Sequence, residues 1–402
     1  MSVLFWLEIV VCAVALIVTA NTINNAFAFR RLADYASAGT ATSRVSVLVP
    51  ARNEERAIGA CLDSLISQEY GEYEIIVLDD GSDDRTAFIA RSLAERCGIL
   101  RVETGQALPS GWFGKAYACD QLAALARGDV LIFTDADTVH APTMIRSVVG
   151  AMAAGADVVT AFPEQQIGGW SEALVVPFMI FTVWALLPIG RVWSDPSPRV
   201  VAANGQLLSF TRSAYERVGG HRAVRLSVLD DMDLVRRAKR CGLRVRLADG
   251  VGIVRTRMYR SVAEVWRGFS KNAYALTGSS PSIALGFAML LMWLYLIPSV
   301  ILGIGLITGR DSWTWRILPM VLVILMFVQN AVVARRTRRP FWQPVVHPLC
   351  VVCFIVILAN SVRWRLRGAT AWKGRMYATT SPSVSDAVEG GEEALKGRSP
   401  HR

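Results

Sequence analysis

The fold of this 402-residue chain is indicated by the stretch Val45-Ser46-Val47-Leu48-Val49-Pro50-Ala51-Arg52-Asn53-Glu54-Glu55, an apolar run that ends in polar and acidic residues. Three further acidic motifs follow it, in the order Leu78-Asp79-Asp80-Gly81-Ser82, Thr134-Asp135-Ala136-Asp137-Thr138 and Leu229-Asp230-Asp231-Met232-Asp233-Leu234. Each of the first three motifs closes an apolar run typical of a buried parallel strand. Acidic groups just past such strand ends suit a nucleotide and its metal ion.

Strand and helix signals alternate along the first part of the chain. We predict strands at Val45–Val49, Glu74–Leu78, Ile99–Val102, Val130–Phe133 and Val158–Ala161. Helices are expected to start near Ile58, Ser82 (as an N-cap), Ala116 and Pro142. Further on, the pattern predicts strands at Val200–Ala203 and Gln206–Phe210 and helices at Asp231–Cys241 and Ser261–Tyr274. This alternation predicts an α/β domain with an open, mainly parallel sheet.

Hydrophobic residues make up 52 % of the chain and are concentrated in a few segments. Leu4 to Ala20, Ala284 to Ile307 and Ile317 to Ala334 are long enough, or nearly so, to cross about 30 Å of hydrocarbon. The first run could also be a cleaved signal peptide, but Arg30-Arg31 follow it instead of preceding it. We therefore predict an uncleaved anchor at residues 1–29 and a membrane region at residues 284–362.

The net charge of +10 comes partly from basic clusters beside these apolar segments, at Arg30-Arg31, Arg335–Arg339 and Arg363–Arg367. Basic flanks mark the cytosolic side of a membrane, and the same distribution argues against nucleic-acid binding. Seven scattered cysteines fit reduced thiols in a cytosolic domain. We expect a multi-pass protein of the cell (inner) membrane with a cytoplasmic catalytic domain. The polar segment 380–402 is predicted to be a disordered tail.

Two apolar segments leave the number of spans open. A full span at Val345–Ala359 would place the Arg363–Arg367 cluster outside the cell, against the positive-inside tendency. Either that segment is re-entrant, or residues 170–190 also span the membrane, which adds one crossing and reverses the side on which the later segments begin. The tryptophans around residues 170–190 favour a segment in the membrane interface, and a span or a buried core helix is the alternative.

The ordered motifs resemble those of the family 2 glycosyltransferases, which have a Rossmann-like GT-A catalytic domain. The resemblance covers about Val45 to Tyr274 and implies a glycosyltransferase domain at residues 44–275. Its Gly111-Trp112-Phe113-Gly114-Lys115 stretch is similar to a subgroup that glycosylates carotenoid or hopanoid-type lipids. Processive polysaccharide synthases of the family carry Gln-x-x-Arg-Trp before the membrane helices, and residues 262–272 lack that motif.

Asp135 and Asp137 form an Asp-x-Asp pair that can hold a hard divalent cation, Mg²⁺ or Mn²⁺, together with a diphosphate. The resemblance implies that Asp137 is the main metal ligand and that Asp135 contacts the ribose and assists. It also implies that one aspartate of the Asp79-Asp80 pair, for which we favour Asp80, holds a uracil ring. The other wall of the nucleotide pocket is expected to be the first motif, through Pro50, Ala51, Asn53 and Glu55.

Lys115 is expected at the start of a helix, where the helix dipole disfavours a cation, so an anionic partner such as a diphosphate is predicted. An ordinary surface lysine is the alternative. By the resemblance, Asp231 is the general base that deprotonates the acceptor hydroxyl. Clustered carboxylates raise one another's pKa, which suits a base. Asn204, Gln206 and Asp230 are expected on the acceptor side, although Asn204-Gly205 also fits a plain turn.

We therefore predict an inverting, metal-dependent transfer of a hexose from a UDP-sugar to a lipid acceptor at the cytosolic membrane face. The close alternatives are a polyprenyl-phosphate glycosyltransferase and a polysaccharide synthase. A GT-A-like nucleotidyltransferase is less favoured because it has little need of membrane helices, and a non-catalytic membrane scaffold would not need intact acidic motifs.

Overall fold

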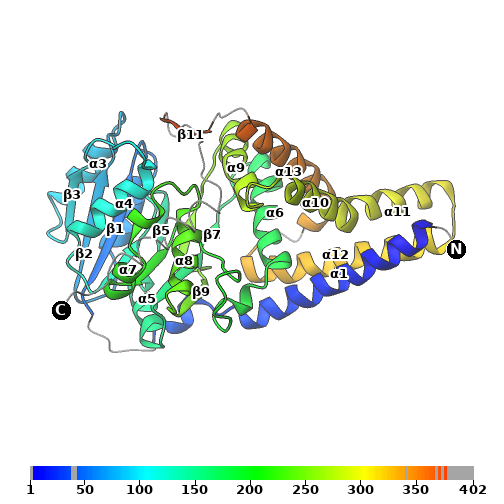
Figure 1. Ribbon diagram of the computed structural model, residues 1–402, viewed down its shortest axis with the longest axis horizontal. Helices are drawn as coiled ribbons and strands as arrows, with labels where there is room; N and C mark the ends of the chain where they lie inside the picture. The colour runs from blue at the N-terminus through cyan, green and yellow to red at the C-terminus, as the bar shows by residue number, and fades with distance from the viewer. Residues whose placement is uncertain (1–2, 38–42, 340–341, 367–369, 373–374, 378–402) are drawn as a thin grey trace, which may run out of the picture.

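The computed structural model describes residues 3–37, 43–339, 342–366, 370–372 and 375–377. A sheet covered by helices forms one end of the molecule, and long helices extend from it toward the N-terminus (Figure 1). The predicted disordered tail at residues 380–402 lies outside the described residues.

The main sheet has seven strands in the order β3-β2-β1-β4-β8-β6-β9. Its strands are β1 (Val45–Ala51), β2 (Tyr73–Asp79), β3 (Leu100–Thr104), β4 (Val130–Phe133), β6 (Val158–Phe162), β8 (Leu208–Thr211) and β9 (Val245–Asp249). Strands β3, β2, β1 and β4 pair in parallel, as do β6 and β9, whereas β8 is antiparallel to both β4 and β6. The predicted mainly parallel α/β sheet is confirmed, with one reversed strand that was not predicted.

Helices cover both faces of this sheet because successive strand residues point to opposite sides. Val47 and Val49 of β1 pack toward one face, and Leu48 packs toward the other. The first face is covered by α2 (Ile58–Ile66), α3 (Thr86–Ala94) and α5 (Met144–Ala153), and the second by α4 (Gly114–Leu125), α7 (Arg212–Arg217) and α8 (Asp230–Arg240). This double coverage explains why the strands read as continuous apolar runs.

A second, three-stranded sheet lies beside the third acidic motif and was not predicted. Strand β10 (Val254–Thr256) pairs antiparallel with β5 (Thr138–His140) and parallel with β7 (Glu164–Gln165). These strands have only two or three residues each, so they lack the apolar alternation by which a strand is recognised in a sequence. The small sheet fixes the chain that follows Asp137.

Two local predictions are wrong. Val200–Ala203 forms no strand, because residues 204–207 make a tight turn in which the Leu207 amide donates to the Asn204 carbonyl at 3.3 Å, and β8 begins only at Leu208. Ser82 does not cap a helix: α3 begins at Thr86, and the Ser82 hydroxyl instead accepts a hydrogen bond from the Asn53 amide at 3.0 Å.

Within the described residues, four helices are long and apolar enough to cross a membrane, which indicates membrane association. They are α1 (Val3–Ala28), α10 (Pro281–Leu291) continued through a π turn into α11 (Ile297–Thr308), α12 (Leu318–Thr337) with the π turn before it, and α13 (Gln343–Leu366). Helix α6 (Trp170–Leu186) is apolar but shorter, and it continues through Pro177.

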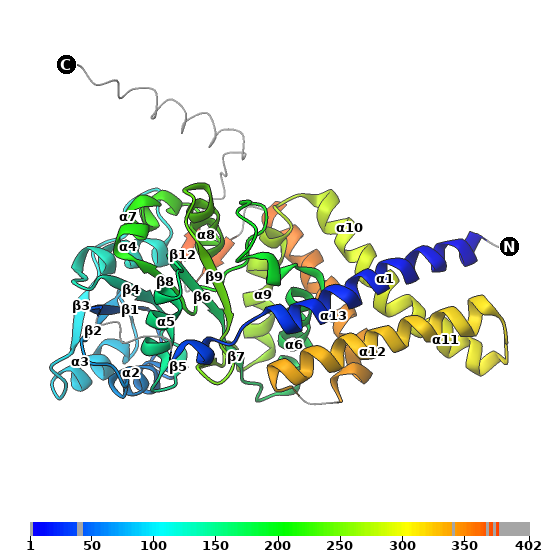
Figure 2. The same cartoon turned by 90° about the horizontal axis from the view of Figure 1, so that it is seen from below.

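These helices form two groups. Helices α1, α11 and α12 run side by side away from the sheet, whereas α13 lies across their direction and packs against α6 and α9 (Val262–Leu276) (Figures 1 and 2). The α9–α13 contact includes a hydrogen bond from the Asn360 amide to the Ser270 hydroxyl at 2.9 Å. Helices α6, α9 and α13 therefore form a layer between the sheet and the three long helices.

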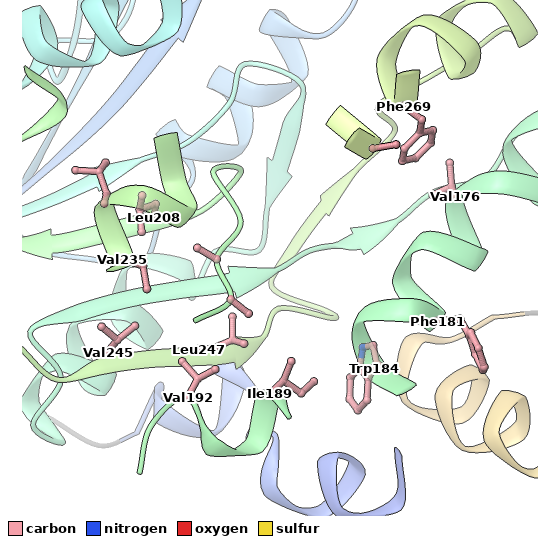
Figure 3. Close-up of a cluster of buried hydrophobic side chains, with 14 of the residues drawn as sticks. Val176, Phe181, Trp184, Ile189, Val192, Leu208, Val235, Val245, Leu247 and Phe269 are labelled. Carbon is pink, nitrogen blue, oxygen red and sulfur yellow. The ribbon is translucent and has the colours of Figure 1, made fainter. Parts of the chain in front are cut away.

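One hydrophobic core joins the sheet to this layer. Buried side chains from β8, α8 and β9, among them Leu208, Val235 and Leu247, continue into Trp184 and Phe181 of α6 (Figure 3). A shared core of this kind holds the layer of helices rigidly against the sheet, because interiors are close-packed and resist sliding.

Candidate active site

The first two motifs meet at neighbouring strand ends. The Asp80 amide donates to the Ala51 carbonyl at 2.9 Å, and the Arg52 guanidinium donates to the Asp80 carbonyl. The Asp79 carboxylate accepts from the Ser82 amide at 3.3 Å and so closes the turn. Asp79 and Asp80 are each only 6 % exposed. The structure thus brings together the two predicted walls of the nucleotide pocket.

Asn53 and Glu55 hold these two loops to each other. Asn53 has a φ of 53°, a left-handed conformation that asparagine tolerates, and its Oδ1 accepts from the Asp83 amide at 2.9 Å. The Glu55 carboxylate accepts from the Arg85 amide at 3.3 Å. Both side chains therefore position the pocket wall by bonding the loop after β2.

Lys115 and Asp135 form an ion pair at the end of β4. The Lys115 Nζ lies 2.5 Å from an Asp135 carboxylate oxygen, with the two side chains 28 % and 27 % exposed. Burial disfavours the ammonium, but the negative charges of Asp135 and Asp230 outweigh it and raise the pKa of Lys115 above its usual value. The anionic partner expected for Lys115 is, in this structure, a member of the Asp-x-Asp pair.

Asp231 stands at the start of α8 and fixes the loop opposite it. One carboxylate oxygen accepts from the Gly205 amide at 2.8 Å, and the other accepts from the Met232 amide at 2.7 Å. Burial and the neighbouring Asp230 charge raise the pKa of Asp231 to about 6, although Lys115 and these two amides work in the opposite direction. A carboxyl with such a pKa can accept a proton near neutral pH.

These groups share one small pocket. It is lined by Pro50, Lys115, Asp135, Gly205, Asp230 and Asp231, together with Cys119, Phe133, Thr134, Leu208 and His221. A Cβ added to Gly205 would lie 3.1 Å from the Lys115 Nζ, so the loop backbone approaches the ammonium closely. Pro50, Lys115 and Asp135 from the predicted donor side therefore meet Asp230 and Asp231, although Pro50 and Asp231 are 181 positions apart in the sequence.

Asn204 and Gln206 shape the loop between these two sides. The Asn204 side chain accepts from the Gln206 amide at 2.8 Å, and the Asn204 backbone bonds to the Thr160 hydroxyl through both its amide and its carbonyl. The Gln206 side chain bonds to Gln165 and Thr256. Asn204 therefore stabilises the turn of this loop, and the buried Gln206 side chain anchors the loop to the neighbouring strands.

A buried network behind the pocket contains residues that the sequence analysis missed. The Thr134 hydroxyl donates to the Gln206 carbonyl at 2.8 Å, and the Thr138 hydroxyl donates to the Asp135 carbonyl at 2.6 Å. The His140 Nε2 lies 3.1 and 2.9 Å from these two hydroxyls. The network ties the Asp-x-Asp loop to the 204–206 loop. Its only signal in the sequence is its adjacency to the third motif.

His221 is a second missed residue, and it lies in the pocket wall. Its Nδ1 is 2.8 Å from the Tyr215 hydroxyl, and its ring packs edge-on against Phe133 with centroids 4.7 Å apart. Burial lowers the pKa of His221 to about 3, so it is neutral. The fourth acidic motif begins eight positions later at Leu229, but nothing in the spacing of that motif points to His221.

The donor set fits a metal ion only with help from a substrate. The described residues contain no group of three histidine, cysteine or acidic side chains that could hold a metal ion by themselves. Asp135 and Asp137 supply two carboxylates at the end of β4, and Mg²⁺ commonly binds to one or two carboxylates plus substrate phosphates. Asp137 is held through its carbonyl, which accepts from the Thr256 hydroxyl at 3.2 Å.

A second pocket lies between the layer of helices and the loop that leads to Asp230. Its lining comes from three segments: Val228 before α8, Ser270, Lys271, Tyr274, Ala275 and Ser279 in and after α9, and Ser361, Trp364 and Arg365 of α13. One of its lining residues, Val228, is therefore only two positions before Asp230 in the sequence.

Comparisons with known proteins match most of the chain. The model of "Glycosyl transferase family 2" matches residues 46–199, and that of "Glycosyl transferase family group 2" matches residues 130–328. A 4,4'-diaponeurosporenoate glycosyltransferase of Staphylococcus haemolyticus is 27 % identical over 354 residues, covering 85 % of this chain and 90 % of the relative. The enzyme of that name from Staphylococcus aureus is 26 % identical over 342 residues, covering 83 % and 88 %.

A solved structure shares the fold. It is a mannosyltransferase from Pyrobaculum calidifontis in complex with GDP-Man and Mn²⁺, with a TM-score of 0.52 and 17 % identity. The match covers 90 % of this chain and 99 % of that chain.

Proposed function

The chain belongs to the family 2 glycosyltransferases, and on that premise we propose that it transfers a hexose from a UDP-sugar to a lipid acceptor at the cytosolic face of a membrane. Its sheet is a GT-A catalytic domain, joined to apolar helices on both sides. One observation carries the proposal: Asp231, Lys115 and Asp135 share a pocket, and a second pocket beside Asp230 reaches the layer of helices.

The nucleotide would lie against the first two motifs. A carboxylate is an acceptor-only group and suits the N3–H of uracil. Since the Asp79 carboxylate closes its own turn, Asp80 is the better candidate for this contact. Pro50 and Ala51 would form the opposite wall, and Asn53 and Glu55 would hold that wall in place through the loop after β2.

The diphosphate would lie beside the Asp-x-Asp pair. Asp137 and Asp135 would hold Mg²⁺ or Mn²⁺ together with phosphate oxygens, and the metal would offset the charge of the departing diphosphate. The related fold of the mannosyltransferase, whose complex contains Mn²⁺, supports a divalent ion here. Lys115, already paired with a carboxylate, would supply a charge-assisted hydrogen bond to a phosphate oxygen.

Asp231 would act as the general base. The oxygen of an acceptor hydroxyl attacks the anomeric carbon, the bond from that carbon to the diphosphate breaks, and the hydroxyl proton passes to the Asp231 carboxylate. A single displacement of this kind inverts the anomeric centre. The Gly205 and Met232 amides orient the carboxylate, and its pKa of about 6 leaves it ionised before the reaction at neutral pH.

The names of the two staphylococcal relatives support a carotenoid-type lipid as the acceptor. The helix arrangement supports the same conclusion. Helices α1, α10–α11 and α12 would cross the bilayer, and α13 would lie along its cytosolic side with α6 and α9. This topology keeps the basic ends of both α12 and α13 on the cytosolic side, as the positive-inside tendency requires.

Product analysis tests the proposal. Membranes containing the enzyme are supplied with radiolabelled UDP-glucose, and membranes containing the Asp231→Asn variant serve as the control. We expect label in the organic-solvent phase as a discrete mono-glycosylated lipid. A polymer that lengthens with time would identify a polysaccharide synthase, and mild-acid release of the sugar from a lipid phosphate would identify a polyprenyl-phosphate glycosyltransferase.

A further inference from the structure

A pocket of about 330 Å³ lies where α1 joins the sheet domain, and it shares no residue with the lining of the candidate active site. It is lined by residues 27–30 at the end of α1, by Ile189, Gly190 and Trp193 after α6, and by Arg246 and Leu247 of β9. Figure 3 shows Ile189 and Leu247 on the side of the domain that faces α1. The pocket therefore lies at the joint between a membrane helix and the edge of the sheet.

Two arginines, Arg30 and Arg246, line this pocket, and none of its lining residues carries a carboxylate. The Arg246 guanidinium stacks on the Trp193 ring, 3.4 Å from its centroid, and its buried Nε has no hydrogen-bond partner in the described part of the chain. Arg30 is exposed, and its side chain makes no hydrogen bond or ion pair with other described residues. The nearest carboxylate on β9, that of Asp249, is buried and does not line the pocket, although the Asp249 amide donates to the Arg30 carbonyl at 2.9 Å.

Two like charges beside one pocket oppose each other unless an anion lies between them. Burial lowers the pKa of Arg246; Tyr35 works in the opposite direction, and the positive charge of Arg30 adds to the lowering. An anion with several oxygens would offset both effects, because it would accept hydrogen bonds from the two guanidinium groups and neutralise the pair. Guanidinium groups suit phosphate in particular, since their donors form a planar fork.

The pocket also lies at the end of α1, where the exposed apolar face of that helix gives way to arginines. Ile23 and Phe27 of α1 are 39 % and 85 % exposed and carry the apolar face of that helix down to the pocket. At the same level, Arg336 at the basic end of α12 donates to the Phe29 carbonyl. An apolar helix face that ends in arginines is the pattern expected at the head groups of the cytosolic leaflet.

We propose that this pocket binds the phosphate-bearing head group of an anionic membrane lipid. Arg246, held by Trp193, and Arg30 donate to the phosphate oxygens, and the acyl chains lie along the exposed face of α1 beside Phe27. The lipid would hold the sheet domain at a fixed depth against the bilayer. This site is separate from the proposed acceptor site and does not depend on the proposed reaction.

Native mass spectrometry of the full chain in detergent tests the proposal with phosphatidylglycerol and phosphatidylcholine as probes. We expect phosphatidylglycerol to bind more tightly than phosphatidylcholine, and Arg30→Gln to weaken phosphatidylglycerol binding by about tenfold, the scale of one lost charged hydrogen bond. Arg91→Gln is the matched control, because it removes one exposed charge from α3, which packs on β3 and β2 at the opposite edge of the sheet from β9. It should bind phosphatidylglycerol as the unmodified chain does.

Arg246→Gln and Arg246→Lys extend the test. Loss of binding in Arg246→Gln with partial recovery in Arg246→Lys supports the site. The exposed Arg30 side chain bonds to no other residue that the structure describes, so Arg30→Gln keeps the test valid if Arg246→Gln unfolds. Equal losses in Arg30→Gln and Arg91→Gln would show nonspecific attraction and overturn the proposal. Displacement of the lipid by an equal concentration of inorganic phosphate would assign the pocket to a soluble anion and would also overturn it.

Discussion

The two sides of the candidate active site are built differently. On the donor side, residues 50–55 and 79–86 are held by many short hydrogen bonds between adjacent loops, and each loop directly follows a parallel strand. On the acceptor side, residues 204–206 are held by bonds to several separate elements: Asp231 at the start of α8, Thr134 after β4 and Thr160 of β6. Nucleotide binding therefore depends on two neighbouring loops that bond to each other, whereas placement of the base depends on one loop that bonds to several elements.

The largest effect should come from the acceptor side. We expect Asp231→Asn to lower the rate of transfer by about two to four orders of magnitude, the usual contribution of a general base, with little change in UDP-sugar binding. Single-turnover kinetics with saturating donor measures this. Asp233→Asn is the matched control on the same helix end, where Asp233 pairs with Arg236 and accepts from Ser227. Near-normal turnover of Asp231→Asn would mean that Asp231 only fixes the loop at Gly205.

Lys115 connects the two sides, so its removal should affect both. We expect Lys115→Met to lower kcat/KM by about 10- to 100-fold, which corresponds to the loss of a hydrogen bond from a charged group. Arg91→Met serves as the control for an exposed cation. Steady-state kinetics over a range of UDP-sugar and acceptor concentrations separates the two contributions. If kcat/KM were unchanged, the Lys115–Asp135 pair would have no part in the reaction.

The pH dependence sharpens the assignment of the base. A base must be ionised to accept a proton, and the pKa of Asp231 is raised to about 6 by burial and by Asp230. We therefore expect kcat to fall by up to about tenfold for each pH unit below 6 and to level off above it. Because the charge of Lys115 opposes this rise, Lys115→Met should move the acid limb to higher pH. A pH-independent kcat between about 5 and 8 would contradict the assignment.

The smallest effect concerns the ion pair that joins α6 to the chain after β10. Arg257, just after β10, forms two hydrogen bonds at 2.9 and 3.0 Å with Glu172 of α6, which is only 1 % exposed. Arg257→Met would leave this carboxylate with fewer partners and should lower the free energy of unfolding by about 1–3 kcal/mol. Thermal unfolding in detergent measures the loss, and Arg257→Met combined with Glu172→Gln should lose less than the two single changes added together. Strict additivity would show that the pair is not coupled.

The same contrast explains what the sequence could predict. The donor-side motifs follow apolar strands directly, so Pro50, Asp80 and Asp135 could be placed from sequence alone. The reversal of β8 could not, because its apolar pattern is the same in either direction. His221 and the His140 network were missed for a related reason: they reach the site through packing and hydrogen bonds that leave no periodic signal. Ser82 was wrongly predicted to be an N-cap, because a serine before acidic residues can accept a hydrogen bond from a helix start or from a neighbouring loop equally well.

Donor binding is expected to depend on the metal-binding Asp-x-Asp pair, and proton transfer on Asp231 across the pocket. Isothermal titration of UDP, with and without Mn²⁺, into the unmodified chain, Asp137→Ala and Asp231→Asn tests this directly. We expect Mn²⁺ to strengthen UDP binding in the unmodified chain and in Asp231→Asn, and to have no such effect in Asp137→Ala. An Asp137→Ala variant that binds UDP as tightly as the unmodified chain in the presence of Mn²⁺ would contradict the account.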